Sequence, residues 1–198
     1  TLSNIDITSS DSLSLGARTG INFEGTTALN LAGATLNVEV YESFTVESSH
    51  ANVFNATPVD ELNISAGVIE GVRNTSEEAG LTIAASLRSG ESMTLRGGVG
   101  GSGDVTFTGA PTDTPTLTTQ DLTLWAGDGG ATNIEPRVVA IDPDTGTGLV
   151  NFTLIGDEPA FTLRQSASIT NNNIPNASQF MTGGVAANVV EGIDGVDY

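Results

Sequence analysis

The chain has no cysteine and no lysine among its 198 residues, and its six basic residues, all arginine, stand against 24 acidic ones. Without cysteine there can be no disulfide, no thiolate metal site and no cysteine nucleophile. The formal net charge of -18 disfavours nucleic acid and anionic membrane surfaces as partners, because both are bound through clustered lysine and arginine. The same charge favours solubility and the binding of divalent cations.

Aromatic residues are also scarce, at 5% of the chain. The core must therefore be filled mainly by Leu, Ile, Val and Ala, which suits thin and repetitive layers. No run of about 18 apolar residues is present, so we expect no membrane insertion. The chain starts at Thr1 without a Met, a basic region or an apolar leader, as expected of a mature product, a fragment or one unit of a longer chain.

What the sequence has in abundance is a triplet of an apolar, a small polar and an apolar residue, usually with Ser, Thr or Asn at its centre. Alternation with a period of two predicts a short strand with one buried face and an outward-facing middle residue. The triplets are Ile5-Asp6-Ile7, Leu13-Ser14-Leu15, Leu29-Asn30-Leu31, Leu36-Asn37-Val38, Phe44-Thr45-Val46, Leu62-Asn63-Ile64, Leu81-Thr82-Ile83, Met93-Thr94-Leu95, Val105-Thr106-Phe107, Leu122-Thr123-Leu124, Phe152-Thr153-Leu154 and Phe161-Thr162-Leu163.

Clusters of Gly, Asn and Asp separate these triplets, and such clusters turn the chain. Short strands spaced by roughly 8 to 12 residues fit either a β-solenoid or an antiparallel β-sandwich. Repetition of one local motif favours the solenoid, with residues 1–198 forming a single all-β domain. The least strand-like stretch, residues 66–80, is expected to be a loop with room for one helical turn.

Four segments combine a strand triplet with flanking Gly, Ser or charged residues: Ser89–Gly98 (SGESMTLRGG), Gly103–Thr108 (GDVTFT), Asp121–Gly127 (DLTLWAG) and Phe161–Ile169 (FTLRQSASI). These segments resemble the coils of large secreted repetitive exoproteins of the filamentous-haemagglutinin and autotransporter-passenger kind. This resemblance implies a right-handed parallel β-helix, export from the cell and a role in adhesion or surface architecture. It implies no catalytic residues.

One segment has the alternating oxygen ligands of a calcium loop, with Asp142, Asp144 and Gly146 at every second position. The place of the bidentate glutamate in such a loop is taken by Thr153, so a plain Asp-Pro-Asp turn is the alternative. Calcium is the only cofactor that the sequence indicates.

Sequons for N-glycosylation are frequent. Candidate acceptors are Asn63, Asn74, Asn151 and Asn176, whereas the sequon at Asn55 is weakened by a proline that follows it. For Asn63 and Asn151, which lie in or beside triplets, the alternative is an outward ladder of amides. Chance matches are expected in a chain so rich in Asn, Ser and Thr.

Residues for catalysis are few. His50 is the only histidine, lies in a polar stretch, and is expected to be a structural surface residue rather than a general base. No pair of carboxylates stands out by its spacing, so we expect no catalytic residues and no enzyme activity.

Trp125 is the one aromatic residue of functional interest, because Leu122 and Leu124 take the inward phase of its strand. An outward indole can stack on a sugar or bind a neighbouring subunit. The alternative is that it packs beneath the loop at residues 127–133.

The two ends of the chain fit together as a pattern. Joining Tyr198 to Thr1 continues the alternation, with Val196, Tyr198 and Leu2 apolar at every second position. This would follow if the chain were one unit of a tandem array or if subunits stacked head to tail; coincidence is the alternative.

These observations predict a structural protein at the cell surface or outside the cell, namely a subunit or repeat of a filament or an adhesin that associates with itself. The first alternative is a β-domain that binds cell-surface glycans, with calcium, through Trp125. The second alternative is a β-helix enzyme that degrades polysaccharides.

Overall fold

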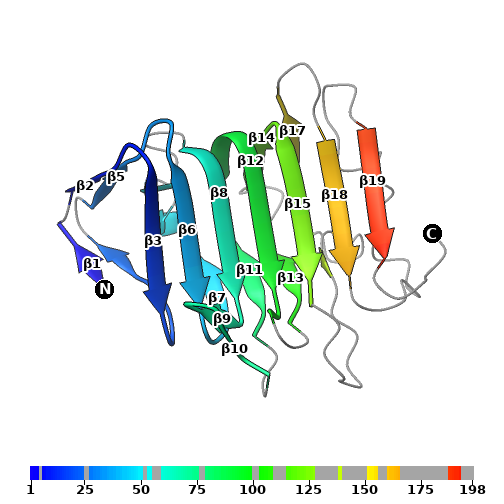
Figure 1. The fold of residues 1–198 in the computed structure, drawn as a ribbon, viewed down its shortest axis with the longest axis horizontal. Helices are drawn as coiled ribbons and strands as arrows, with labels where there is room; N and C mark the ends of the chain where they lie inside the picture. Colours follow the sequence, from blue (N-terminus) through cyan, green and yellow to red (C-terminus); the bar gives the residue numbers. More distant parts are fainter. Residues whose placement is uncertain are drawn as a thin grey trace.

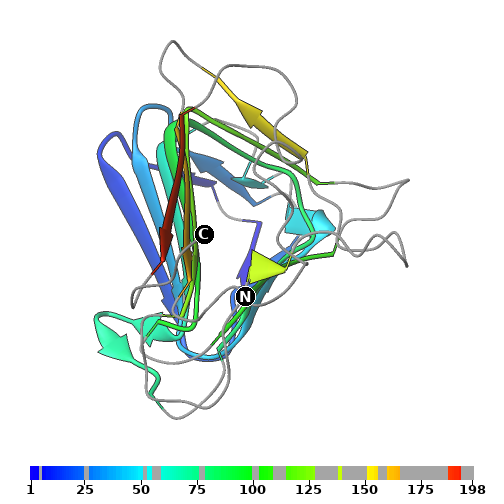
Figure 2. The ribbon, with the colours of Figure 1, turned by 90° about the vertical axis from the view of Figure 1, so that its right-hand side faces the viewer.

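The computed structural model describes residues 1–4, 6–24, 27–50, 53–54, 59–75, 79–99, 103–108, 115–127, 138–139, 151–155, 160–165 and 187–192. Over these residues the chain is all-β and winds as a β-solenoid. Seen along the coil, the strands form the sides of a roughly triangular cross-section (Figure 2). None of the helical segments in these ranges has the length and apolar character needed to span a membrane.

The largest side, which we call the broad sheet, consists of parallel strands that follow one another in chain order (Figure 1). They are β3 (Ser12–Ala17), β6 (Thr35–Val40), β8 (Val59–Ala66), β12 (Leu87–Gly97), β15 (Asp121–Ala126), β18 (Ala160–Gln165) and β19 (Ala187–Gly192).

Shorter strands form the other sides. The back sheet holds β7 (Phe44–Val46), β11 (Leu81–Ile83), β13 (Val105–Phe107) and β16 (Val138–Val139), again all parallel. The first residues of β12 pair with β14 (Thr116–Thr119), which pairs with β17 (Asn151–Leu154). In the first two coils β1 (Leu2–Ser3) pairs with β4 (Phe23–Glu24), and β2 (Asp6–Thr8) with β5 (Ala28–Asn30). A 3₁₀ turn, η1 (Ser48–His50), follows β7.

The coil is right-handed. In Figure 2, which looks from the C-terminal strands, the chain descends the broad sheet on the left, crosses below and returns along the back sheet while it advances toward the viewer. Right-handed crossovers are the rule for parallel strands because of the strand twist. The parallel pairing confirms the predicted β-helix and excludes the antiparallel sandwich.

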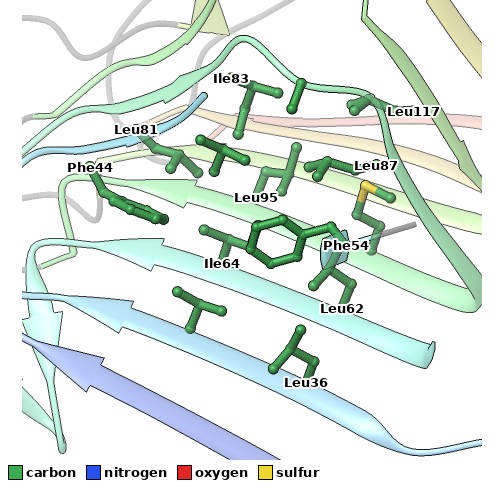
Figure 3. Close-up of a cluster of buried hydrophobic side chains, with 14 of the residues drawn as sticks. Leu36, Phe44, Phe54, Leu62, Ile64, Leu81, Ile83, Leu87, Leu95 and Leu117 are labelled. Atoms are coloured by element: carbon green, nitrogen blue, oxygen red, sulfur yellow. The ribbon is translucent and has the colours of Figure 1, made fainter. Parts of the chain in front are cut away.

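The apolar residues of the triplets form two inward rows along the broad sheet. One row aligns Leu13, Leu36, Leu62, Met93 and Leu122, and the other aligns Leu15, Val38, Ile64, Leu95 and Leu124. From the second coil onward these side chains are at most 2% exposed. They pack against residues of the other sides such as Leu81, Ile83 and Leu117 (Figure 3). The thin aliphatic core expected from the composition is therefore present.

The stretch 66–80 differs from its prediction. Its described part contains an antiparallel hairpin, β9 (Val68–Ile69) and β10 (Val72–Arg73), and no helical turn. Glu70 (φ 48°) and Gly71 (φ 77°) form the two-residue turn, with the positive φ angles that a tight hairpin requires. The Glu70 N–H donates to Glu39 Oε2 at 2.7 Å, which fixes the hairpin against the second coil.

Candidate functional site

The outer face of the broad sheet carries the middle residues of the triplets in one straight row. The strand pairing aligns Ser14, Asn37, Asn63, Thr94 and Thr123. Ser14 is exposed, and the other four residues are half-buried. Neighbouring strands lie about 4.8 Å apart, so the polar groups can bond from coil to coil. Asn63 Nδ2 donates to Asn37 Oδ1 at 3.0 Å. The predicted outward ladder is therefore confirmed on this face.

A second outer row runs beside it, through Glu39, Ser65, Arg96 and Trp125. The guanidinium carbon of Arg96 lies 3.7 Å from the centroid of the Trp125 ring. Such a cation–π stack contributes about 0.5–2 kcal/mol. Trp125 is thus a half-buried residue of the outer face, as predicted, but one face of its indole is already covered by Arg96.

The candidate glycosylation sites fall in different environments. Asn63 belongs to the amide ladder, and Asn151 begins β17. Asn74 is only 1% exposed, and its Nδ2 donates to the Tyr41 carbonyl at 3.0 Å. Because a glycan needs an exposed amide nitrogen, this geometry argues against a glycan at Asn74. Asn55 and Asn176 lie outside the described residues.

The candidate calcium ligands Asp142 and Asp144 also lie outside the described residues. Within the described ranges, no group of three or more His, Asp or Glu side chains comes close enough together to hold a metal ion. The calcium loop therefore stays a prediction.

His50 is a core residue and not the surface histidine that the sequence indicated. Its side chain is 2% exposed, and its ring meets Phe23 edge to face at 5.4 Å. Nδ1 accepts a hydrogen bond from the Glu47 N–H at 3.3 Å, so the neutral ring carries its proton on Nε2. Burial lowers the pKa of His50, and the charge of Glu47 raises it to a smaller extent. The apolar partner Phe23 lies in another coil, which is why local composition missed this burial.

Among the coils from β3 to β15, whose side-chain burial the structure describes, the first coil has the least covered core residues. The first coil contributes Leu2, Leu13 and Leu15, which are all half-buried. Their neighbours in the second coil are better covered: Leu36, paired with Leu13, is 2% exposed, and Val38, paired with Leu15, is 0% exposed. Thr1 is exposed, and the Leu2 N–H donates to the Asn22 carbonyl at 2.7 Å. Tyr198, the other half of the predicted junction, lies outside the described residues.

Comparisons with protein-family models, with curated proteins and with solved structures find no match for this chain. The outer face of the broad sheet, with its polar row and the Arg96–Trp125 stack, is therefore the surface that bears on function.

Proposed function

We propose that the protein is a structural subunit of an extracellular filament or surface adhesin. The observation that carries this proposal is the parallel stacking of coils, in which the two core rows and the outer polar row continue from β3 to β15. Each coil is held to the next by backbone hydrogen bonds along the axis and by shared apolar rows. A rod built in this way resists bending and local opening.

The composition of the surface fits such a role. Ladders of Asn, Thr and Ser give the outer face hydrogen-bonding groups. Among the side chains whose exposure the structure describes, Val72 is the one large hydrophobic residue that is exposed. The net charge of -18 keeps neighbouring rods apart by repulsion. An extracellular location is part of the proposal and is supported by the resemblance to secreted β-helical exoproteins.

Negative-stain electron microscopy of the purified protein, with limited proteolysis alongside, tests this function. We expect elongated particles or filaments whose protected fragments include residues 59–127, the best-covered coils. Discrete globular particles that proteases degrade readily would contradict the proposal.

A second candidate function is binding of surface glycans on the outer face of the broad sheet. The specific observation in its favour is the Arg96–Trp125 stack, which lies beside the hydroxyl groups of Thr94 and Thr123. A glycan array with and without calcium tests it, with Trp125→Ala compared with Thr45→Ala on the back sheet. Binding that Trp125→Ala abolishes and Thr45→Ala retains would support this function; equal binding by both variants would contradict it.

A further inference from the structure

The β9–β10 hairpin lies on the outer side of the broad sheet, at the end where the strands of that sheet finish (Figure 2). It follows β8 of the third coil, whereas β3 and β6 belong to the first and second coils. Its base is closed by the Asn74 N–H, which donates to the Gly67 carbonyl at 2.8 Å. The buried side chain of Asn74 donates from Nδ2 to the carbonyl of Tyr41 in the second coil. The hairpin is therefore anchored at its base.

The tip of the hairpin is bound to the second coil as well. Glu39 Oε2 accepts from the Glu70 N–H at 2.7 Å, and a carboxylate acceptor makes such a bond stronger than a neutral one. Glu70 makes this contact from a left-handed backbone with a φ of 48°, which a residue with a Cβ adopts only at a cost in free energy. The bond to Glu39 offsets part of that cost and favours the folded-back position of the hairpin.

The hairpin also reaches the first coil. The strand pairing aligns Gly16, Glu39 and Ser65 in one outer row. Ile69 occupies the space that a side chain at Gly16 would fill, since a Cβ at Gly16 would lie 3.3 Å from Ile69 Cγ1. Neighbouring strands are about 4.8 Å apart, so this contact spans two strand spacings. The third coil therefore touches the first coil directly, past the second.

A contact of this kind changes how a solenoid opens. In a protein of stacked repeats each repeat contacts only its neighbours, so that its stability is a sum of repeat and nearest-neighbour contributions and end repeats can separate singly. Here the first coil cannot separate from the second without also leaving Ile69 of the third. Segments linked in this way open together, as one cooperative unit.

We propose that the β9–β10 hairpin is a clasp that makes the coils of β3, β6 and β8 open as one unit. Within the described ranges it is the one antiparallel pair of strands, and the later strands β12 and β15 are joined to their neighbours by parallel pairing. This inference concerns the opening of the solenoid and holds whether or not the protein forms filaments.

Native-state hydrogen exchange of single amides tests the clasp, because particular amides report on particular coils. The Tyr41 N–H donates to the Ala17 carbonyl at 3.0 Å and reports on separation of the first coil from the second. The Gly67 N–H donates to the Val40 carbonyl at 2.8 Å and reports on separation of the second coil from the third. We expect the Tyr41 and Gly67 amides to have the same protection factor in the wild-type protein.

The decisive comparison is Ile69→Ala with Val72→Ala. These two residues are cross-strand partners in the hairpin, but Ile69 covers Gly16 whereas Val72 is 60% exposed. Ile69→Ala should lower the protection of the Tyr41 amide about tenfold relative to that of Gly67, and Val72→Ala should leave both unchanged. The Gly127 amide, which donates to the Gly97 carbonyl in later coils, should be unaffected in both variants.

Deletion of residues 68–73 provides a second variant. It joins Gly67 to Asn74, which already share a hydrogen bond, and removes the clasp while the broad sheet keeps its strands. The Tyr41 amide should then lose at least as much protection as in Ile69→Ala, with circular dichroism and Trp125 fluorescence reporting that the variant is folded. Unequal protection of Tyr41 and Gly67 in the wild-type protein, or the same effect from Ile69→Ala and Val72→Ala, would overturn the clasp.

Discussion

A buried pair of hydroxyl groups joins two successive coils where β12 turns from one side of the solenoid to the next. Ser89 Oγ donates to Thr119 Oγ1 at 2.7 Å, and both residues are 0% exposed. Thr119 Oγ1 also lies 3.3 Å from the Glu91 carbonyl and 3.2 Å from the Asp121 carbonyl, either of which can accept its proton. The two hydroxyls therefore form a short chain that ends on the backbone.

This arrangement predicts strong coupling in a double-mutant cycle. Thr119→Val leaves the Ser89 hydroxyl buried without its acceptor and should lower the free energy of unfolding by about 1–3 kcal/mol. Ser89→Ala removes only the donor, because the Thr119 hydroxyl keeps its carbonyl partners, and should cost about 1 kcal/mol. Replacing both leaves no buried hydroxyl without a partner, so the double variant should be about 1–2 kcal/mol more stable than the sum of the single changes predicts.

Urea denaturation followed by the fluorescence of Trp125 measures these differences. Trp125 is the only tryptophan of the chain and lies in β15, which directly follows the strand of Thr119. Ser14→Ala, an exposed change in the first coil, serves as the control and should shift the midpoint very little. Single effects that add without coupling would refute the hydrogen bond between the two coils.

Three further predictions follow from single sites. Burial lowers the pKa of His50, so as the pH falls the unfolded chain takes up a proton before the folded one. The stability due to the neutral ring should therefore be lost as the pH falls below the usual value of 6.5. In urea titrations at several pH values, His50→Asn, which offers a non-titrating acceptor to the Glu47 N–H, should lose less stability in acid than the wild type. Glu70→Asn should stabilise the fold by less than about 1–2 kcal/mol and so raise the melting temperature slightly, because Asn tolerates the φ of 48° better than Glu. A clearly lower melting temperature would contradict the turn geometry. Ile64→Ala should cost about 2–5 kcal/mol, since the side chain is 0% exposed, while the outward change Ser65→Ala should be nearly neutral in the same denaturation assay.

The alternation of the sequence was enough to predict short strands and the two faces of each strand, and the repetition of one triplet favoured the solenoid over the sandwich. Leu62-Asn63-Ile64 shows why, since its two apolar residues are 0% exposed and its Asn stands in the outer ladder. Alternation is decided by contacts within one strand, so a local pattern reports it reliably.

Features that depend on contacts between coils were not predictable in this way. The hairpin at residues 68–73 is a corner insertion whose turn residue, Glu70, is stabilised by a carboxylate of an earlier coil. His50 is buried because Phe23, far away in the sequence, packs against it. Coil length also varies, from 23 residues between Leu13 and Leu36 to 39 between Leu122 and Phe161, which hides the repeat in the sequence.

The central claim is that this protein builds a rod by stacking parallel coils along one axis. X-ray diffraction from oriented filaments of the purified protein tests it most directly, because the strands then lie across the filament axis. We predict a meridional reflection at a spacing of about 4.8 Å, the distance between neighbouring strands. The same reflection on the equator, or scattering from separate globular particles alone, would contradict the claim.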